Sequence, residues 1–175
     1  HGLGVIGGGR GSSFAAAAPV VVPLQMGTLS KAVGAYGGYL CTSRSVAELV
    51  RNRARSFVYS TGLPPGTVAA ATSALDLIAT DAALVRRPLE RAQQFTAALG
   101  LPPATSPIVS LIQGGAAQAL AASDTLRQAG FLVAAIRPPT VPPGTARLRV
   151  TFSAQHSTAQ VAALAMAVRP LLAVA

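Results

Sequence analysis

The single lysine of this sequence stands in a pattern that could do chemistry. Thirteen of the fourteen basic residues are arginines, so Lys31 is the only side chain that offers a primary amine. It belongs to a small-residue turn, T-L-S-K-A-V-G at 28–34, which follows an apolar run typical of a short strand. Ligands of open α/β sheets gather beyond the carboxyl ends of strands, and a desolvated lysine amine there can form a Schiff base. By spacing alone T-x-x-K is a weak pattern, and a surface lysine is the alternative.

A second motif points to nucleotide binding but lacks its context. Residues 2–7, G-L-G-V-I-G, match the dinucleotide fingerprint G-x-G-x-x-G. That fingerprint needs a preceding strand, a following helix and an acid about twenty residues further on for the ribose. The first acidic residue of any kind here is Glu48. We therefore interpret 1–11 as a glycine-rich loop.

Composition excludes several classes of protein. With 51% hydrophobic and 11% charged residues, the chain is not intrinsically disordered. The net charge of +9 makes nucleic acid or an anionic surface a candidate partner. One cysteine, Cys41, forbids an internal disulfide and offers no metal quartet, so we expect no metal. The apolar run 14–26 is cut by two prolines and Gln25, so we expect no membrane span and a cytoplasmic location.

The elements that must position the lysine turn alternate between strand and helix, as in an α/β fold. In the first part we expect strands at 20–28 and 37–42, a helix at 45–54 behind the capping box S-V-A-E, and helices from 65 to the low 80s and at 88–99. Gly100 followed by two prolines marks a chain stop and a domain boundary. Two domains follow, 1–100 and 101–175.

The second domain has clear periodicity. We expect strands at 107–113, 131–136 and 147–152, helices at 116–129 and 158–172, and a proline-rich loop at 137–144. The strand at 147–152 alternates apolar and polar residues, so one face is buried and the other solvated. The last helix follows a second capping box, S-T-A-Q at 157–160.

Four sequence runs together resemble one enzyme family. They are H-G-L-G-V at 1–5, T-L-S-K-A at 28–32, R-S-F-V-Y-S-T-G-L-P-P at 55–65 and A-I-R-P-P-T-V-P-P-G-T-A-R-L-R at 135–149. In this order they resemble the C-terminal part of the pyridoxal-phosphate-dependent α-oxoamine synthases. The last run is most similar to the members that form 8-amino-7-oxononanoate. The resemblance implies an α/β fold, namely the C-terminal part of a fold-type-I transferase: the remainder of the large domain and the small C-terminal domain.

The resemblance also implies residue roles. Lys31 matches the lysine that holds pyridoxal 5'-phosphate as an internal aldimine and then serves as a base. Thr28 matches a threonine that contacts the cofactor, and His1 a histidine near the ring's phenolic oxygen. Thr61 is similar to a residue that reaches the phosphate of the neighbouring subunit's cofactor, which implies a homodimer with its active site at the subunit interface. Each has a structural alternative: Thr28 finishing a strand, for example, or Thr61 capping the helix that begins near Pro64.

The substrate loop is the other implied site. Arg137 and Thr140 match the loop that holds the substrate, and the planar fork of an arginine suits a carboxylate. Arg137 as a solvated loop cation is the alternative. The implied reaction condenses L-alanine with pimeloyl-CoA or a pimeloyl acyl-carrier protein, with loss of CO2, in biotin biosynthesis. The family's aspartate three residues before the histidine, and its N-terminal half, have no counterpart here, so we expect a fragment that is inactive alone.

Three other hypotheses are open. One is another α-oxoamine synthase, glycine C-acetyltransferase or 5-aminolevulinate synthase, against which the I-R-P-P run at 136–139 argues. Another is a basic nucleic-acid-binding module, motivated by the arginines at 44–55. The arginines are nevertheless spread along the chain, and no nucleic-acid-binding motif appears, so we expect no nucleic-acid partner. The third is a catalytically inactive dimer partner.

Overall fold

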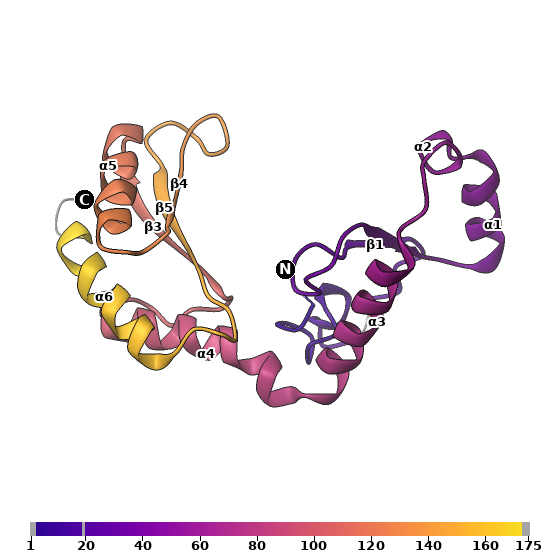
Figure 1. The fold of residues 1–175 in the computed structure, drawn as a ribbon, viewed down its shortest axis with the longest axis horizontal. Helices are drawn as coiled ribbons and strands as arrows, with labels where there is room; N and C mark the ends of the chain where they lie inside the picture. The colour runs from indigo at the N-terminus through magenta and orange to yellow at the C-terminus, as the bar shows by residue number, and fades with distance from the viewer. Residues whose placement is uncertain (1–2, 19, 173–175) are drawn as a thin grey trace. The chain divides into compact units, whose positions relative to one another are not determined.

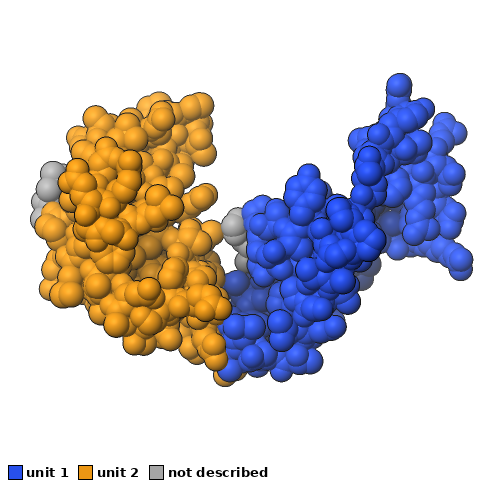
Figure 2. Space-filling model, viewed as in Figure 1, with its two compact units in different colours: residues 1–85 blue, residues 86–175 orange. Residues whose placement is uncertain are grey.

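The computed structural model describes residues 3–18 and 20–172. The chain divides into two compact units, residues 1–85 and 86–175, which are described separately (Figure 2). The division falls between Val85 and Arg86, within one helix. The domain boundary that the sequence marks near Gly100 stays a prediction.

The described residues of unit 1 form one hairpin, a short 3-10 helix and three complete α-helices. Strand β1 (Gln25–Thr28), labelled in Figure 1, pairs antiparallel with β2 (Gly38–Cys41), and the lysine turn connects the two strands in sequence. A short 3-10 helix, η1 (Ser12–Phe14), precedes the hairpin, and α1 (Arg44–Arg53), α2 (Arg55–Val58) and α3 (Pro65–Thr80) follow it. Helix α3 starts with proline at its first position, where the missing N–H removes no helical hydrogen bond.

The strand expected at 20–28 was wrong in its bounds and in its burial. The run at 20–28 forms a strand only from Gln25, because Pro23 has no N–H to give to a ladder. The run is also not buried: Val21 is 90% exposed and Met26 80%, since no second layer of described residues covers this hairpin.

The capping box expected at 45–48 does not form. Helix α1 begins one residue earlier, with Ser43 at the N-cap in an extended conformation and without a side-chain capping bond. Ser45 therefore lies inside the first turn, where its hydroxyl is 3.4 Å from that of Ser43. Glu48, which should have reached back to the cap, pairs with Arg51 at 3.7 Å instead.

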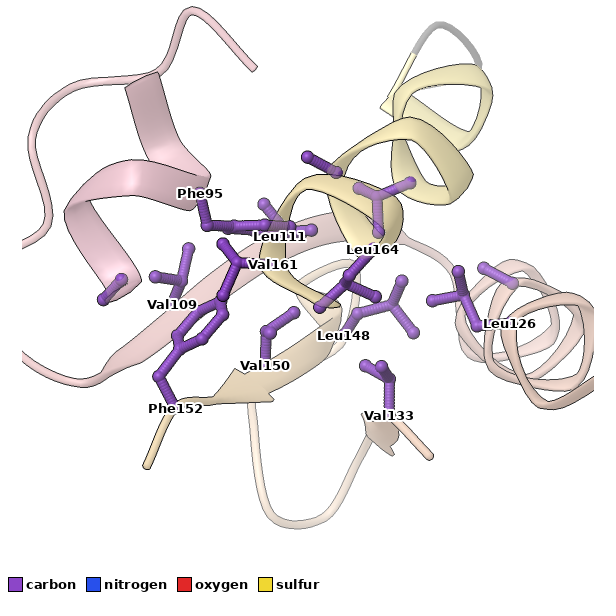
Figure 3. Close-up of a cluster of buried hydrophobic side chains, with 14 residues drawn as sticks. Phe95, Val109, Leu111, Leu126, Val133, Leu148, Val150, Phe152, Val161 and Leu164 are labelled. Atoms are coloured by element: carbon purple, nitrogen blue, oxygen red, sulfur yellow. The ribbon is translucent and has the colours of Figure 1, made fainter. Parts of the chain in front are cut away.

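Unit 2 combines a three-stranded sheet with three helices. Strands β3 (Ile108–Gly114), β5 (Ala146–Thr151) and β4 (Ala134–Ile136) are antiparallel in the order β3-β5-β4. Helices α4 (Ala82–Ala98), α5 (Ala116–Gln128) and α6 (Thr158–Leu172) contribute side chains to the core on one face of the sheet (Figures 1 and 3). The mixed helix and sheet content confirms the predicted α/β class.

Helix α4 starts earlier than the expected 88. Its first turn is capped by Asp81, whose Oδ1 accepts the backbone N–H of Leu84 at 2.8 Å. Pro88 therefore lies inside the helix rather than at its start. The stabilisation of the helix by this cap and by the apolar residues beyond Pro88 exceeds the cost of the one backbone hydrogen bond that the proline removes.

The core of unit 2 is continuous. The largest of its fully buried side chains come from α4, α5, β5 and α6: Phe95, Leu126, Leu148, Val161 and Val168. Figure 3 labels the first four of them. Alternation in β5 is confirmed, with Leu148 and Val150 buried and Arg149 exposed between them. At roughly 1.5–3 kcal/mol for each fully buried large apolar side chain, this cluster is the main source of stability in the unit.

The second capping box is confirmed and fixes the start of α6. Gln160 N–H donates to Ser157 Oγ at 3.2 Å, and Ser157 N–H donates to Gln160 Oε1 at 2.8 Å. The helix spans Thr158–Leu172, as the sequence predicts. No single helix among the described residues is long and apolar enough to cross a membrane; by length and composition only, the bent pair α3 and α4 passes that test jointly.

Candidate functional site

The lysine turn is anchored by apolar residues on either side of Lys31. Leu29 is 8% exposed and Val33 5%, and both pack with Ala71 of α3 in the buried cluster of unit 1. Leu29 lies two residues before Lys31 and Val33 two residues after it. Both side chains are buried in the cluster, whereas Lys31 between them is exposed. The turn is therefore held by a small apolar cluster on one side, while its lysine is exposed.

Backbone hydrogen bonds close the turn. Leu29 N–H donates to Gly37 O at 2.9 Å, Ala35 N–H to Leu29 O at 2.8 Å, and Gly34 N–H to Lys31 O at 2.9 Å. Gly34 and Gly37 have φ angles of 66° and 104°, which residues other than glycine rarely adopt. The turn thus has a defined shape that the two glycines permit.

The hydroxyl of Thr28 is tied into the same turn. Its Oγ1 is 2.7 Å from Ser30 Oγ, accepts Ser30 N–H at 3.2 Å and lies 3.3 Å from Gly37 O, to which it donates. Thr28 therefore finishes β1, as its structural alternative proposed, and also lies three residues from Lys31 in one ordered loop. The turn therefore carries two hydroxyl groups in contact with each other and one exposed amine, and hydroxyl and amine groups can donate hydrogen bonds to an anionic ligand.

Thr61 lies in the same compact unit. It is exposed in the segment between α2 and α3. Helix α3 has Pro64 at its N-cap and no side-chain capping bond, so Thr61 is not the helix cap that its alternative proposed. Leu63, two residues further on, packs against the turn that carries Lys31. The remaining predicted residue of this site, His1, lies outside the described residues.

The predicted substrate residues lie in unit 2. Arg137 directly follows β4 and is exposed, as is Thr140. Thr140 N–H donates to Arg137 O at 3.1 Å, and Thr145 N–H donates to Pro142 O at 3.2 Å. The loop between β4 and β5 is therefore folded on itself at both ends. Its two candidate binding residues share one turn.

Two further arginines share this sheet and were not singled out from the sequence. Arg147 and Arg149 alternate along β5 with the buried Leu148 and Val150, so both extend from the face opposite the core. Arg147 Nε donates to Thr145 O at 3.0 Å, which ties it to the end of the loop. The strand alternation predicted this placement, but it was interpreted only as a solvated face.

The positive charges of Arg147 and Arg149 have no acidic partner in the described strands of their own sheet. No acidic residue occurs in the described strands β3, β4 or β5. The ion pairs found in the described part of the chain are Glu48 with Arg51, Arg86 with Glu90, and Asp124 with Arg127, all exposed and each of small energetic weight. Carboxylate and phosphate groups are the ligands that such an arginine face fits best.

A metal centre is not indicated. No group of three or more His, Cys, Asp or Glu side chains that could hold a metal ion occurs among residues 3–18 and 20–172. Neither Lys31 nor any of the sheet arginines forms an ion pair with an acidic side chain in these ranges.

The sequence matches one family model and many curated proteins. The model for "Aminotransferase class I and II" covers residues 5–168. A putative 8-amino-7-oxononanoate synthase of Acidiphilium cryptum is 64% identical over 168 residues, which are 96% of this chain and 43% of that protein. The 8-amino-7-oxononanoate synthase of Granulibacter bethesdensis is 59% identical over 172 residues, 98% of this chain and 44% of that protein. The chain thus spans less than half the length of these relatives, and the resemblance found in the sequence is confirmed.

Solved structures share the fold. A high-resolution structure of SPT with PLP internal aldimine has a TM-score of 0.91 at 28% identity and covers 100% of this chain and 47% of that one. The 8-amino-7-oxononanoate synthase of Francisella tularensis has a TM-score of 0.78 at 25% identity, covering 98% of this chain and 52% of that one. These likenesses confirm the predicted fold, the C-terminal part of a fold-type-I transferase.

Proposed function

Because this chain belongs to the aminotransferase class I and II family, we propose that it is part of an 8-amino-7-oxononanoate synthase, a C-acyltransferase that uses pyridoxal 5'-phosphate. The observation that carries the proposal is the exposed Lys31, the only side-chain amine in the sequence, on a turn anchored by buried residues. Identities of 59–64% to curated proteins of that name support this choice of substrate class.

The residues of the turn fit the cofactor. When bound, the cofactor supplies an aldehyde that condenses with an amine and a ring that draws electrons from the bonds of the substrate's α-carbon. Lys31 Nζ has no acidic partner in the described residues, so it is available for such a bond. Thr28 and Ser30 place hydroxyl groups on the same turn as this amine. We assign Thr61 to the phosphate of a neighbouring subunit's cofactor and His1 to the ring's oxygen.

The arginines of unit 2 receive the substrate's carboxylate in this proposal. Arg137 and Thr140 share one turn of the loop between β4 and β5, so a carboxylate can take both an arginine fork and a hydroxyl. Arg149, on the face of β5 opposite the core, supplies a second cation. Arg147 is already engaged with the loop carbonyl of Thr145 through Nε. Its part is to hold the loop in place.

The proposed reaction joins L-alanine to a pimeloyl thioester of CoA or acyl-carrier protein. A carbon–carbon bond forms between the alanine α-carbon and the acyl carbonyl carbon, while the thioester bond breaks and the thiol leaves. The bond between the α-carbon and the alanine carboxylate then breaks to release CO2, and a proton takes its place on the α-carbon. The products are 8-amino-7-oxononanoate, CO2 and the free thiol. The amine of Lys31 is the base that takes the α-proton of alanine in this proposal. We place the working enzyme in the cytoplasm as a homodimer.

A second candidate function rests on the solved structures. Serine palmitoyltransferase of Sphingomonas wittichii has a TM-score of 0.89 at 30% identity, so another α-oxoamine synthase, using a different amino acid or acyl group, fits the same fold. The identity of 64% to an 8-amino-7-oxononanoate synthase favours that enzyme over this alternative. Competing amino acids, alanine against glycine and serine, distinguish the two.

Product formation tests the proposal. The full-length protein, loaded with pyridoxal 5'-phosphate, is given L-alanine and pimeloyl-CoA, and thiol release and CO2 are followed. We expect both in a one-to-one ratio, and we expect neither from Lys31→Arg, which keeps the charge and removes the nucleophilic amine. The 175-residue chain alone should also give neither. Turnover by Lys31→Arg at the native rate, or no preference for alanine over glycine and serine, would overturn the assignment.

A further inference from the structure

One contact joins the two segments of unit 1 that carry proposed cofactor residues. Leu63 belongs to the segment after Thr61, and Gly37 closes the turn that carries Lys31. A Cβ atom at Gly37 would lie 2.8 Å from Cδ2 and 2.9 Å from Cδ1 of Leu63, closer than real Cβ contacts come. The isobutyl group of Leu63 therefore occupies the space above Gly37 that any other residue would fill.

Gly37 in turn holds the start of the lysine turn through its carbonyl. Its oxygen accepts Leu29 N–H at 2.9 Å and Thr28 Oγ1–H at 3.3 Å. Leu29 is one of the buried residues that flank the lysine, and Leu63 packs against their cluster as well. A displacement of Gly37 thus reaches the lysine turn through two hydrogen bonds and one shared apolar cluster.

We propose that Leu63 is a positioning residue for Lys31, acting through Gly37. The inference rests on the proposed function of Lys31 and goes beyond it, because it assigns a role to an apolar side chain that touches no reacting atom. The same contact couples the placement of the segment around Thr61 to the placement of the lysine turn. Leucine is suited to this role because both of its terminal methyl groups face the glycine.

The proposal distinguishes positioning from general stability. Leu63 is only partly buried, and its loss removes a contact at the edge of a small cluster rather than from a continuous core. Misplacement of a reacting group by about 1 Å can reduce its effectiveness by roughly a hundredfold. We therefore expect the chemistry of Lys31 to suffer more than the folded state does.

The test compares three variants of the full-length protein with pyridoxal 5'-phosphate as the probe. Leu63→Ala removes the methyl groups that meet Gly37, Leu63→Met keeps the volume, and Leu77→Ala removes a leucine that is 52% exposed on α3 and belongs to no cluster. The readouts are the dissociation constant of the cofactor, the pH profile of its visible absorbance when bound, and the thermal midpoint without cofactor.

We expect Leu63→Ala to bind the cofactor about tenfold more weakly and to shift the midpoint of the pH profile, with a thermal midpoint close to that of Leu77→Ala. Leu63→Met and Leu77→Ala should stay within about twofold of the native protein. An unchanged pH profile and affinity in Leu63→Ala overturns the inference. So does a loss in Leu63→Met equal to that in Leu63→Ala.

Two safeguards keep the outcomes separate. If Leu63→Ala does not fold, Leu63→Val takes its place, because it keeps a branched apolar side chain while withdrawing it from Gly37, and the same two results decide the question. If the native protein itself binds no pyridoxal 5'-phosphate, the proposed function fails. If the native protein binds it and Leu63→Ala behaves identically, only the positioning role fails.

Discussion

Truncation of Phe95 should destabilise unit 2 strongly and selectively. Its side chain is fully buried, and its ring centroid lies 5.2 Å from that of Phe152, so Phe95→Ala removes a tilted aromatic pair and leaves a cavity in the main core. Such a change costs about 3–5 kcal/mol. The free energy of unfolding of a domain is roughly 0.05–0.15 kcal/mol per residue, which gives about 5–13 kcal/mol for a unit of this size. The variant thus loses a large share of the unit's stability.

The tyrosines allow the two units to be followed separately. All three, Tyr36, Tyr39 and Tyr59, lie in unit 1, and the sequence has no tryptophan. Urea unfolding of the chain followed by tyrosine fluorescence therefore reports on unit 1, whereas amide exchange of the β5 residues reports on unit 2. We expect Phe95→Ala to lose several kcal/mol of exchange protection in β5, with little change in the tyrosine transition.

A matched control is Leu132→Ala, which removes a side chain that is 94% exposed in the same unit. It should change stability by less than about 0.5 kcal/mol. A loss below about 1 kcal/mol in Phe95→Ala would refute the assignment of the core. A tyrosine transition that moves as far as the β5 protection would contradict the prediction that the loss is confined to unit 2.

Three further predictions follow from local contacts. Ser157→Ala, which removes the oxygen that accepts Gln160 N–H, should lower the free energy of unfolding of unit 2 by about 1 kcal/mol in urea titrations; no change would remove the capping box from the account. Gly27→Ala should displace the exposed ring of Tyr39, because that ring lies where the new Cβ must go, and an unaltered tyrosine spectrum would contradict this packing. Arg149→Gln should raise the KM for the amino-acid substrate of the full-length enzyme about tenfold, with little change in thermal midpoint, and an unchanged KM would exclude this arginine from the substrate site.

Apart from the starts of α4 and of β4, which spans Ala134–Ile136 rather than the expected 131–136, the sequence predicts unit 2 well because its signals are satisfied locally. The capping box at Ser157 forms because the apolar stripe of α6 behind it has a core to pack against. The alternation along β5 predicts which residues are buried for the same reason. Periodicity reports the buried face correctly when the partner surface lies within the same unit.

Unit 1 is predicted less well for the opposite reason. Its described residues bury only one small cluster, so apolar runs such as 20–24 do not indicate a buried strand. The box at 45–48 fails because Ser43, two residues earlier, takes the N-cap position. Composition alone does not decide which of two serines two residues apart takes the N-cap position.

In the candidate site, too, features set by neighbouring residues could be predicted from the sequence, whereas features set by distant residues could not. Lys31 and Thr28 are close in sequence, so their shared turn could be predicted from the T-L-S-K run. The role of Gly37 and Leu63 could not, because they meet the turn through contacts of long sequence separation. The arginines of β5 were visible in the alternation. Their uncompensated charge required knowledge of which strands lie beside them.

The most direct test of the central claim is chemical trapping at Lys31. The protein is incubated with pyridoxal 5'-phosphate, reduced with borohydride and digested with trypsin, which cleaves after Arg10 and Arg44. We predict that cleavage after Lys31 is blocked and that the reduced adduct lies in the peptide 11–44. An adduct found on any other amine, with Lys31 unmodified in the cofactor-bound protein, would contradict the account.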